Sequence, residues 1–231
     1  MPRAEKTTFT DAQIIEGFLK TSFGAEFQLA GRVDRIRKYR KPVRVFISSK
    51  SRPDRRKQLG GIIADIGSHI QHLDIAVTED RAAANLLVTL VLDRDFGKEL
   101  AAMYGEDRAR EIKRSLDPQC LSGFTKNENF EIEHAEILLT SDVGDFTFRD
   151  CAYEEILQAL GPINDTSTVP WTMFNDDVQM GYFDVYDQHI LNMLYDPRIK
   201  AGMTIDETKA VLPEVLVSVR AFVAAINGLG R

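Results

Sequence analysis

Residues 149–165 read RDCAYEEILQALGPIND, and this stretch decides how the whole chain is interpreted. Its apolar residues return at helical spacing and a glycine follows them, which is typical of an amphipathic helix that ends near Gly161. Glu154 and Gln158 are four residues apart. We therefore expect them to lie on one face of this helix, one turn apart, with Glu155 beside them.

The spacing of these polar residues resembles that of a zinc hydrolase. In the H-E-x-x-H motif, two histidines bind the metal and the glutamate between them acts as general base on bound water. The longer metzincin pattern, H-E-x-x-H-x-x-G-x-x-H, places Glu154, Glu155, Gln158, Gly161 and Asn164 at its defined positions. The glutamate and the glycine are present, whereas all three histidine positions carry other residues.

Two later segments and one earlier strand extend the resemblance to metzincins. Met173, in WTMFND, stands where that family has its Met-turn beneath the metal. Residues 182–196, YFDVYDQHILNMLYD, resemble the terminal helix of the matrix metalloproteases. The strand AEILLT, at 135–140, resembles the edge strand that holds an extended substrate. The residues of this expected peptide-binding edge are Glu136, Ile137, Leu138 and Leu139.

The chain as a whole resembles a bacterial family of unknown function, DUF2927, whose members include predicted lipoproteins. The segments that carry the resemblance are RKPVRVFI at 40–47, FRDCAYEEILQALGPIND at 148–165, MFNDD at 173–177 and LYDPRIKAGMT at 194–204. The resemblance covers residues 33–215 and implies a zincin-like fold and a periplasmic or envelope-associated location. It also implies a disulfide between Cys120 and Cys151, but no known activity.

The residues that replace the histidines are poor zinc ligands. Glu154 could bind a metal through oxygen, but the neutral amides of Gln158 and Asn164 are weak donors to zinc. An oxygen-rich site suits magnesium or calcium better, although this spacing predicts neither ion. We therefore expect no zinc and no other cofactor, and we interpret the site as vestigial. The alternative is a metal-dependent peptidase or other hydrolase that has unusual ligands and uses Glu155 as general base.

The four histidines supply no obvious replacement for these ligands. His69 and His72 are three residues apart on an expected helix, but any helix surface produces such pairs readily. His134 is expected on or near a strand and His189 in the terminal helix. We interpret both as structural or surface residues.

The sequence around this stretch predicts one α+β domain over residues 1–231, with a mixed, mainly parallel sheet in its N-terminal half and mostly helix in its C-terminal half. Residues 42–48 alternate as a strand does, residues 55–72 return to helical period, and residues 84–92, ANLLVTLVL, are typical of a strand buried on both faces. This succession favours a right-handed crossover and parallel strands.

The remaining elements are expected as follows. A docking helix within residues 1–30 begins with Thr10 and Gln13 in capping-box register. A polar helix over 96–115 leads into a loop that contains Cys120. A second capping box opens a C-terminal helical region that is interrupted at Pro213.

Composition and charge limit the class of protein. Hydrophobic residues make up 44% and charged residues 28%, which is typical of a folded globular chain. Residues 32–57 contain 12 Lys and Arg against two Asp, so this segment carries +10 and the remainder −16 of the net charge of −6. We interpret these cations as solvated residues that cover a strand and a helix, and we expect no nucleic-acid partner. The alternative is a structural envelope component whose basic segment contacts anionic surfaces.

The two cysteines by themselves leave the compartment open. In an intracellular chain they would be free thiols, whereas in an exported one they would tend to pair. The opening MPRAEKTTFT lacks the apolar segment of a signal peptide. The protein is then either cytosolic or exported by a leader that would also allow anchoring to a membrane.

The leading hypothesis follows from the resemblance and from the lost ligands. We expect an exported, noncatalytic metzincin-like protein, a pseudo-protease, that binds an extended peptide or an envelope protein by strand addition. Glu154 and Glu155 would line its cleft.

Overall fold

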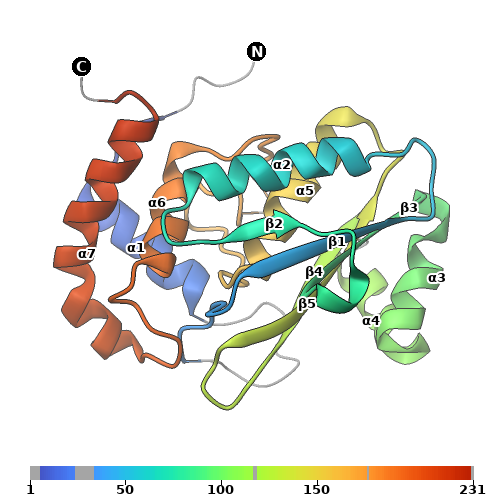
Figure 1. Cartoon of the computed structure of the whole chain (residues 1–231), viewed down its shortest axis with the longest axis horizontal. Coiled ribbons are helices and arrows are strands. Elements are labelled where there is room, and N and C mark those ends of the chain that lie inside the picture. The colour runs from blue at the N-terminus through green and yellow to red at the C-terminus, as the bar shows by residue number, and fades with distance from the viewer. Residues whose placement is uncertain (1–5, 24–33, 117–118, 176, 230–231) are drawn as a thin grey trace.

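The computed structural model describes residues 6–23, 34–116, 119–175 and 177–229, and it has the expected α+β composition. The strands are β1 (Val43–Ser49), β2 (Ile75–Val77), β3 (Leu86–Val91), β4 (Cys120–Lys126) and β5 (Ile132–Thr140). The helices are α1 (Asp11–Ser22), α2 (Arg56–His69), the 3-10 turn η1 (Arg81–Ala83), α3 (Asp93–Tyr104), α4 (Glu106–Leu116), α5 (Asp145–Ala159), α6 (Val185–Tyr195) and α7 (Ile205–Ile226) (Figure 1).

The strands form one sheet in the order β2-β1-β3-β5-β4. β1 is parallel to β2 and β3, and β3 is parallel to β5, so the predicted mainly parallel sheet is confirmed. β4 is antiparallel to β5 and lies at one margin of the sheet. The apolar run predicted to be buried on both faces is β3, which lies in the middle.

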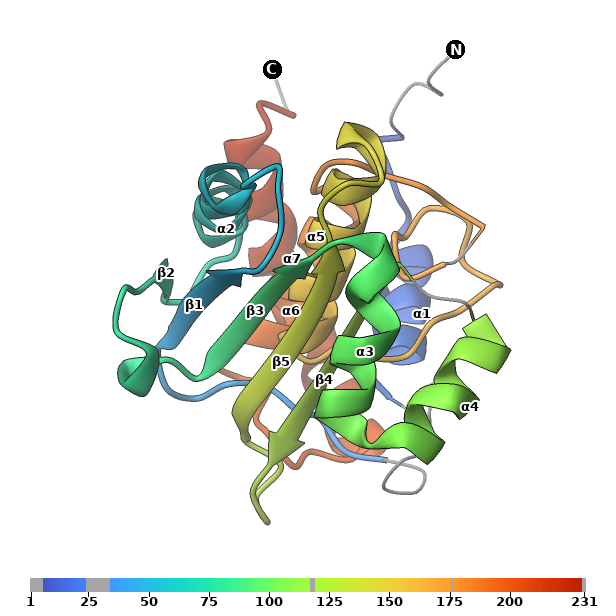
Figure 2. The same ribbon diagram turned by 90° about the vertical axis from the view of Figure 1, so that its right-hand side faces the viewer.

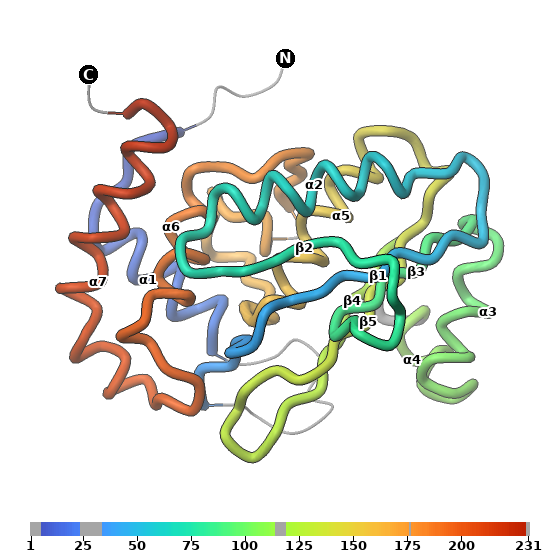
Figure 3. The backbone as a smooth tube through the Cα atoms, viewed as in Figure 1, coloured from blue at the N-terminus to red at the C-terminus, as the bar shows by residue number. Residues whose placement is uncertain are grey.

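Helices cover both faces of the sheet. α2 and α5 pack on one face, and α3 with α4 packs on the other over β5 and β4 (Figure 2). The main core lies under α2, α5 and α6, and a smaller cluster built on Phe96 and Leu100 fills the space under α3. At the far end, α1 packs against α6 and α7, so the first and last helices of the chain lie side by side (Figure 3).

The capping boxes predicted from the sequence are present. The Thr10 hydroxyl accepts from the Gln13 amide at 3.2 Å, and the Gln13 side chain accepts from the Thr10 amide at 3.0 Å. The same reciprocal pair joins Thr204 and Glu207 at the start of α7. The docking helix is therefore α1; the other residues of the predicted 1–30 unit include 1–5 and 24–30, which lie outside the described residues.

Three expectations about the elements are wrong. The loop predicted around Cys120 is the strand β4. The helix predicted over 96–115 is two helices, because Gly105 takes φ 84° between them. α7 continues through Pro213. Pro213 is exposed, so the hydrogen bond that its missing N–H would have made is lost on the solvent side of the helix.

The expected peptide-binding edge also lies in a different place. Residues 136–139 belong to β5, which pairs with β3 on one side and with β4 on the other. Ile137, Leu138 and Leu139 are buried. On this side of the sheet the edge strand is β4. This strand was not predicted, and it occupies the outer position that was expected for β5.

Candidate functional site

One side of α5 faces β4. Cys151, Glu155 and Gln158 recur at intervals of four and three residues, which places them on one stripe of the helix. Cys151 is joined to Cys120 by a disulfide, with Cα atoms 5.8 Å apart. The Ser122 hydroxyl donates to Gln158 Oε1 at 3.4 Å. We call Cys151, Glu155 and Gln158 the β4-facing stripe.

The disulfide implied by the family resemblance is present. It joins the first residue of β4 to the middle of α5 and closes a loop between residues 31 apart in sequence. The resemblance implied the pair, whereas the strand on which Cys120 lies was not predicted.

Gln158 holds three parts of the molecule together. Its Nε2 donates to Asp165 Oδ1 at 2.7 Å, and its Oε1 accepts from Ser122. The first bond fixes the chain that follows α5, and the second fixes β4. Both ends of this amide are therefore used in packing the site.

Asn164 is directed toward a different element. Its Nδ2 donates to the Lys20 carbonyl at 2.7 Å, and its backbone amide donates to the Thr21 carbonyl at 3.2 Å. These bonds dock the turn after α5 on the last turn of α1. Gln158 thus bonds to Asp165, whereas Asn164 attaches the turn after α5 to α1.

Zinc, which the metzincin resemblance implies, does not fit this set of residues. A catalytic zinc site normally offers three strongly donating protein groups, and here two of the three positions are neutral amides engaged in the bonds just described. Within the described ranges, no three His, Cys, Asp or Glu side chains gather into a possible metal-binding group. We therefore derive no step through zinc at this site.

Gly161 follows the end of α5, as the sequence predicts, and its backbone conformation is one that favours glycine. Its φ is 141°, a region that side chains disfavour. A Cβ added there would lie 2.4 Å from the Arg37 carbonyl oxygen and 2.9 Å from Leu194 Cδ2. The glycine therefore lets the chain turn closely under the segment before β1.

Met173 is buried in the main core, and its backbone is held by an aspartate that the sequence did not single out. Asp187, on α6, accepts from the Met173 amide at 2.8 Å and from the Thr172 hydroxyl at 2.5 Å. Burial raises the pKa of the Asp187 carboxyl. This contact fixes the segment around Met173; its assignment as a Met-turn stays a prediction.

The hydrogen bonds at the ends of β5 show which way its amides point. The amides of Ala135 and Ser141 donate to carbonyls beside or in β3, at 3.0 and 2.9 Å. The Thr140 amide donates to the Gln119 carbonyl, next to β4, at 3.1 Å. Because successive residues of a strand alternate in direction, the even-numbered residues of β5 bond to β4.

The outer edge of β4 follows from this alternation. The partners of the even-numbered β5 residues are Leu121, Gly123 and Thr125. The backbone groups of Cys120, Ser122 and Phe124 therefore point away from β5. No strand in the described part of the chain pairs with this side of β4.

A family model described as protein of unknown function (DUF2927) matches residues 11–214. The chain belongs to the DUF2927 family. Searches of curated proteins and of solved structures gave no match. The family resemblance seen in the sequence is thus confirmed, whereas the metzincin and lipoprotein assignments stay predictions.

In this DUF2927 chain, a tyrosine lies over the edge strand on the side opposite α5. A Cβ at Gly123 would lie 2.7 Å from the Tyr104 hydroxyl, so the glycine makes room for the ring. Burial first, and then the carboxylates of Glu136 and Glu155, raise the pKa of Tyr104 to about 12. The tyrosine is therefore a neutral group at pH 7 that covers the middle of β4.

None of the four histidines of the DUF2927 chain lies on the β4-facing stripe. His69 Nδ1 is 3.3 Å from Asp65 Oδ1 on α2, and His134 Nε2 on β5 is 3.6 Å from Glu136. His72 is exposed beyond α2. His189 is buried in α6, where burial lowers its pKa to about 4.

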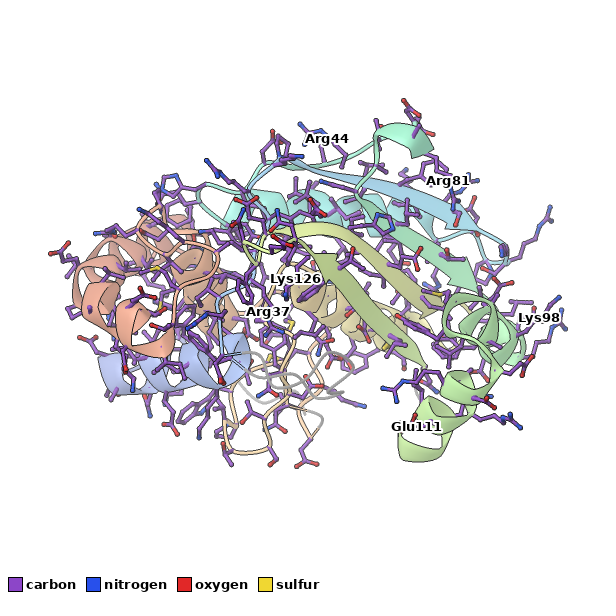
Figure 4. The ribbon with its side chains drawn as sticks, turned by 90° about the horizontal axis from the view of Figure 1, so that it is seen from below. Arg37, Arg44, Arg81, Lys98, Glu111 and Lys126 are labelled. Atoms are coloured by element: carbon purple, nitrogen blue, oxygen red, sulfur yellow. A yellow bond between two sulfur atoms is a disulfide. The ribbon has the colours of Figure 1, made fainter. Side chains whose placement is uncertain are left out.

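The described part of the basic segment, residues 34–57, distributes its cations over several parts of the fold in this DUF2927 chain. In Figure 4, Arg44 lies on β1 and Arg37 lies toward α1. Arg37 is buried and Lys38 is half-buried. The ion pairs that engage other members are Arg40–Glu131, Arg44–Asp74, Lys50–Glu99, Arg55–Asp145 and Arg56–Asp54. Much of this charge is therefore neutralised locally.

Proposed function

We propose that this DUF2927 protein is an exported, noncatalytic protein that binds an extended segment of another protein by strand addition at β4. The observation that carries the proposal is the outer edge of β4, where Cys120, Ser122 and Phe124 direct their backbone groups away from β5. Such groups offer an incoming chain a row of main-chain hydrogen bonds.

The arrangement around β4 supports a holding role. The β4-facing stripe of α5 fixes the strand through a disulfide and a side-chain hydrogen bond. A strand attached in this way is pre-organised, which lowers the entropy lost when a partner binds. The proposed architecture is zincin-like: an antiparallel strand lies outside a parallel sheet, beside a helix that carries Glu154 and Glu155.

The disulfide supports export. Disulfides form and persist in oxidising compartments, and this chain has one. Both cysteines are used in it, so a lipid anchor on cysteine would lie on a leader outside these residues. No helix in the described ranges is long and apolar enough to cross a membrane. The proposed partner is an envelope protein or an extended peptide.

Ser122 allows a direct test of strand addition. Its amide points away from β5, so Ser122→Pro removes an outward donor and leaves the ladder between β4 and β5 intact. Ser122→Ala is the matched control, because it removes the weak bond to Gln158 and keeps the amide. The probe is a pool of fluorescein-labelled, random-sequence decapeptides, and the readout is peptide retained by immobilised protein.

We expect wild type and Ser122→Ala to retain peptides. Ser122→Pro should lose about nine-tenths of that binding, because it removes one main-chain hydrogen bond to the peptide and its ring blocks the approach of the peptide. Unchanged thermal unfolding of Ser122→Pro shows that the fold is intact. Equal retention by Ser122→Pro and wild type would contradict the proposal.

The rival function is a hydrolase with Glu155 as general base. It is separated by elemental analysis of protein made without a histidine tag and dialysed with and without zinc. Our proposal predicts no stoichiometric zinc. Stoichiometric zinc, together with peptide cleavage that Glu155→Gln abolishes, would favour the hydrolase.

A further inference from the structure

α5 presents a second stripe beside the one that faces β4. Thr147, Asp150 and Glu154 are three and four residues apart, and at 100° per residue their mean direction lies about 70° around the axis from the β4-facing stripe. All three are half-buried. The residues that face β4 are buried, with Glu155 6% and Gln158 8% exposed. Thr147, Asp150 and Glu154 therefore form an acidic stripe that solvent reaches next to β4.

A loop lies against the other side of this stripe. The Met180 amide donates to Asp150 Oδ1 at 2.5 Å, and Arg149 Nε donates to the Gly181 carbonyl at 2.9 Å. These two bonds fix residues 180–181 beside the first turns of α5. The acidic stripe thus has β4 on one side and this loop on the other.

Two aromatic side chains are exposed where the loop meets α5. A Cβ at Gly181 would lie 3.5 Å from the Phe146 ring, so this ring lies against the loop, and Tyr182 follows directly in the chain. Phe146 is 54% and Tyr182 41% exposed. Large apolar side chains held this open to solvent by a fixed backbone are typical of contact sites. We call them the aromatic pair.

The orientation of α5 places the aromatic pair at one end of β4. Cys151 contacts Cys120 at the start of the strand, and Gln158 contacts Ser122 further along it. α5 and β4 therefore run in the same general direction along this contact. Phe146 precedes Cys151 by more than one helical turn, so it lies beyond the Cys120 end of β4.

We infer that the acidic stripe and the aromatic pair select the sequence of the segment that binds at β4. This inference rests on the proposed function. The partner is an extended segment with Lys or Arg at alternate positions, because every second side chain of an added strand points to the α5 side of the sheet. Those cations lie opposite Asp150 and Glu154, whose charge they complement.

The same segment carries an aromatic or large aliphatic residue that packs on Phe146 and Tyr182. Antiparallel addition is the more stable of the two directions, and it places the C-terminal end of the partner over Cys120. The aromatic residue of the partner therefore lies C-terminal to its basic residues.

Four fluorescein-labelled dodecapeptides test this order. The first alternates Thr and Lys and has Phe near its C-terminus; the second has Phe near its N-terminus; the third has Glu in place of Lys; the fourth has Ser in place of Phe. Fluorescence polarisation at low and at physiological salt gives the dissociation constants. We expect the first peptide to bind about 5- to 10-fold more tightly than each of the others.

Variants identify the contacts. The double variant Phe146→Ser, Tyr182→Ser should weaken binding of the first peptide about 5-fold. Binding of the fourth peptide should be unchanged, because that peptide has no aromatic ring to pack on the two side chains. Glu154→Gln should weaken binding of the three peptides that carry Lys and reduce the salt dependence of that binding. The control is Val217→Ser, which changes a side chain that is 72% exposed on α7. Unchanged thermal unfolding shows that each variant is folded.

The outcomes separate this inference from the proposed function. If all four peptides bind wild type equally and Ser122→Pro abolishes that binding, strand addition stands and the inference of sequence selection is overturned. If no peptide and no member of the random pool binds wild type, both are overturned.

Discussion

Cys120 and Cys151 are joined by a disulfide that connects the first residue of the edge strand β4 to the helix α5. Along the same contact, Gln158 accepts from Ser122. The strand that we propose as the binding edge is thus attached to the helix that carries Glu154 and Glu155. Its stability and its availability for binding should therefore respond to this bond.

Removal of the disulfide should lower the free energy of unfolding. Closing a loop of 31 residues contributes roughly 3.5 to 4 kcal/mol by the chain-entropy relation. We expect a reductant to lower the urea midpoint of the wild type by a corresponding amount. The double variant Cys120→Ala, Cys151→Ala should unfold at that lower midpoint and be insensitive to reductant. Equal midpoints for reduced and oxidised wild type would show that the bond adds no stability.

Substitution of Gly161 should be strongly destabilising. Gly161→Ala places a Cβ 2.4 Å from the Arg37 carbonyl oxygen at a φ of 141°, so we expect a loss of about 3 kcal/mol in unfolding free energy. The matched control is Gly61→Ala in α2, where nothing lies within 4 Å of the added Cβ. That change should stabilise the protein by about 0.5 to 1 kcal/mol, because alanine favours the helix. A tolerated Gly161→Ala would mean that the turn under Arg37 is looser than described.

Local signals in the sequence predicted much of the fold. Thr10 and Thr204 start helices because each has its capping partner three residues later, a pattern that needs no distant contact. β3 was predicted because its branched apolar run suits a strand buried on both faces. The end of α5 near Gly161 was predicted because helices commonly end at a glycine.

The parts that the sequence did not predict depend on distant contacts. β4, CLSGFTK, lacks a regular alternation of apolar and polar residues, and it is a strand because it pairs with β5 and is joined to α5. Since β4 was missed, β5 was wrongly placed at the edge. Asn164 bonds to Lys20, 144 residues away, and no spacing pattern predicts such a contact. The exposure of Phe146 likewise depends on where the loop at Gly181 lies.

Lys38 should stabilise the end of α6 and the turn that follows it. Its ammonium donates to the carbonyls of Leu194 at 2.7 Å and Ile199 at 2.6 Å, and more weakly to that of Asp196. Lys38→Met leaves these buried carbonyls without the donor, so we expect a loss of about 2 kcal/mol in unfolding free energy. Lys41→Met, at an exposed neighbour, should change it by less than about 0.5 kcal/mol. Equal effects of the two substitutions in urea denaturation would contradict this role.

Asp187 should make stability fall as pH rises. Burial raises the pKa of its carboxyl, so the folded protein keeps this proton to higher pH than the unfolded chain does. The stability that results is complete below the unfolded pKa and is lost as pH rises through the folded pKa. Asp187→Asn does not titrate. We expect it to gain about 1 to 2 kcal/mol relative to wild type between pH 4 and pH 7 in unfolding experiments.

His189, on the same helix, should give the opposite dependence. Burial lowers its pKa to about 4, so its contribution is complete above the unfolded pKa and is lost as pH falls through the folded value. His189→Gln should therefore gain stability relative to wild type as pH falls from 7 to 4. If the stabilities of Asp187→Asn and His189→Gln, relative to wild type, change in the same direction with pH, the assignment of these two titrations is wrong.

The central claim, that β4 has an available outer edge, is tested most directly by residue-resolved amide hydrogen exchange followed by NMR. In the free protein, we predict fast exchange for Ser122 and Phe124 and slow exchange for Leu121, Gly123 and Thr125, which bond to β5. Addition of a decapeptide that the protein binds should selectively slow amide exchange at Ser122 and Phe124. Slow exchange at all five amides in the free protein would show that the edge is already covered, and would contradict the account.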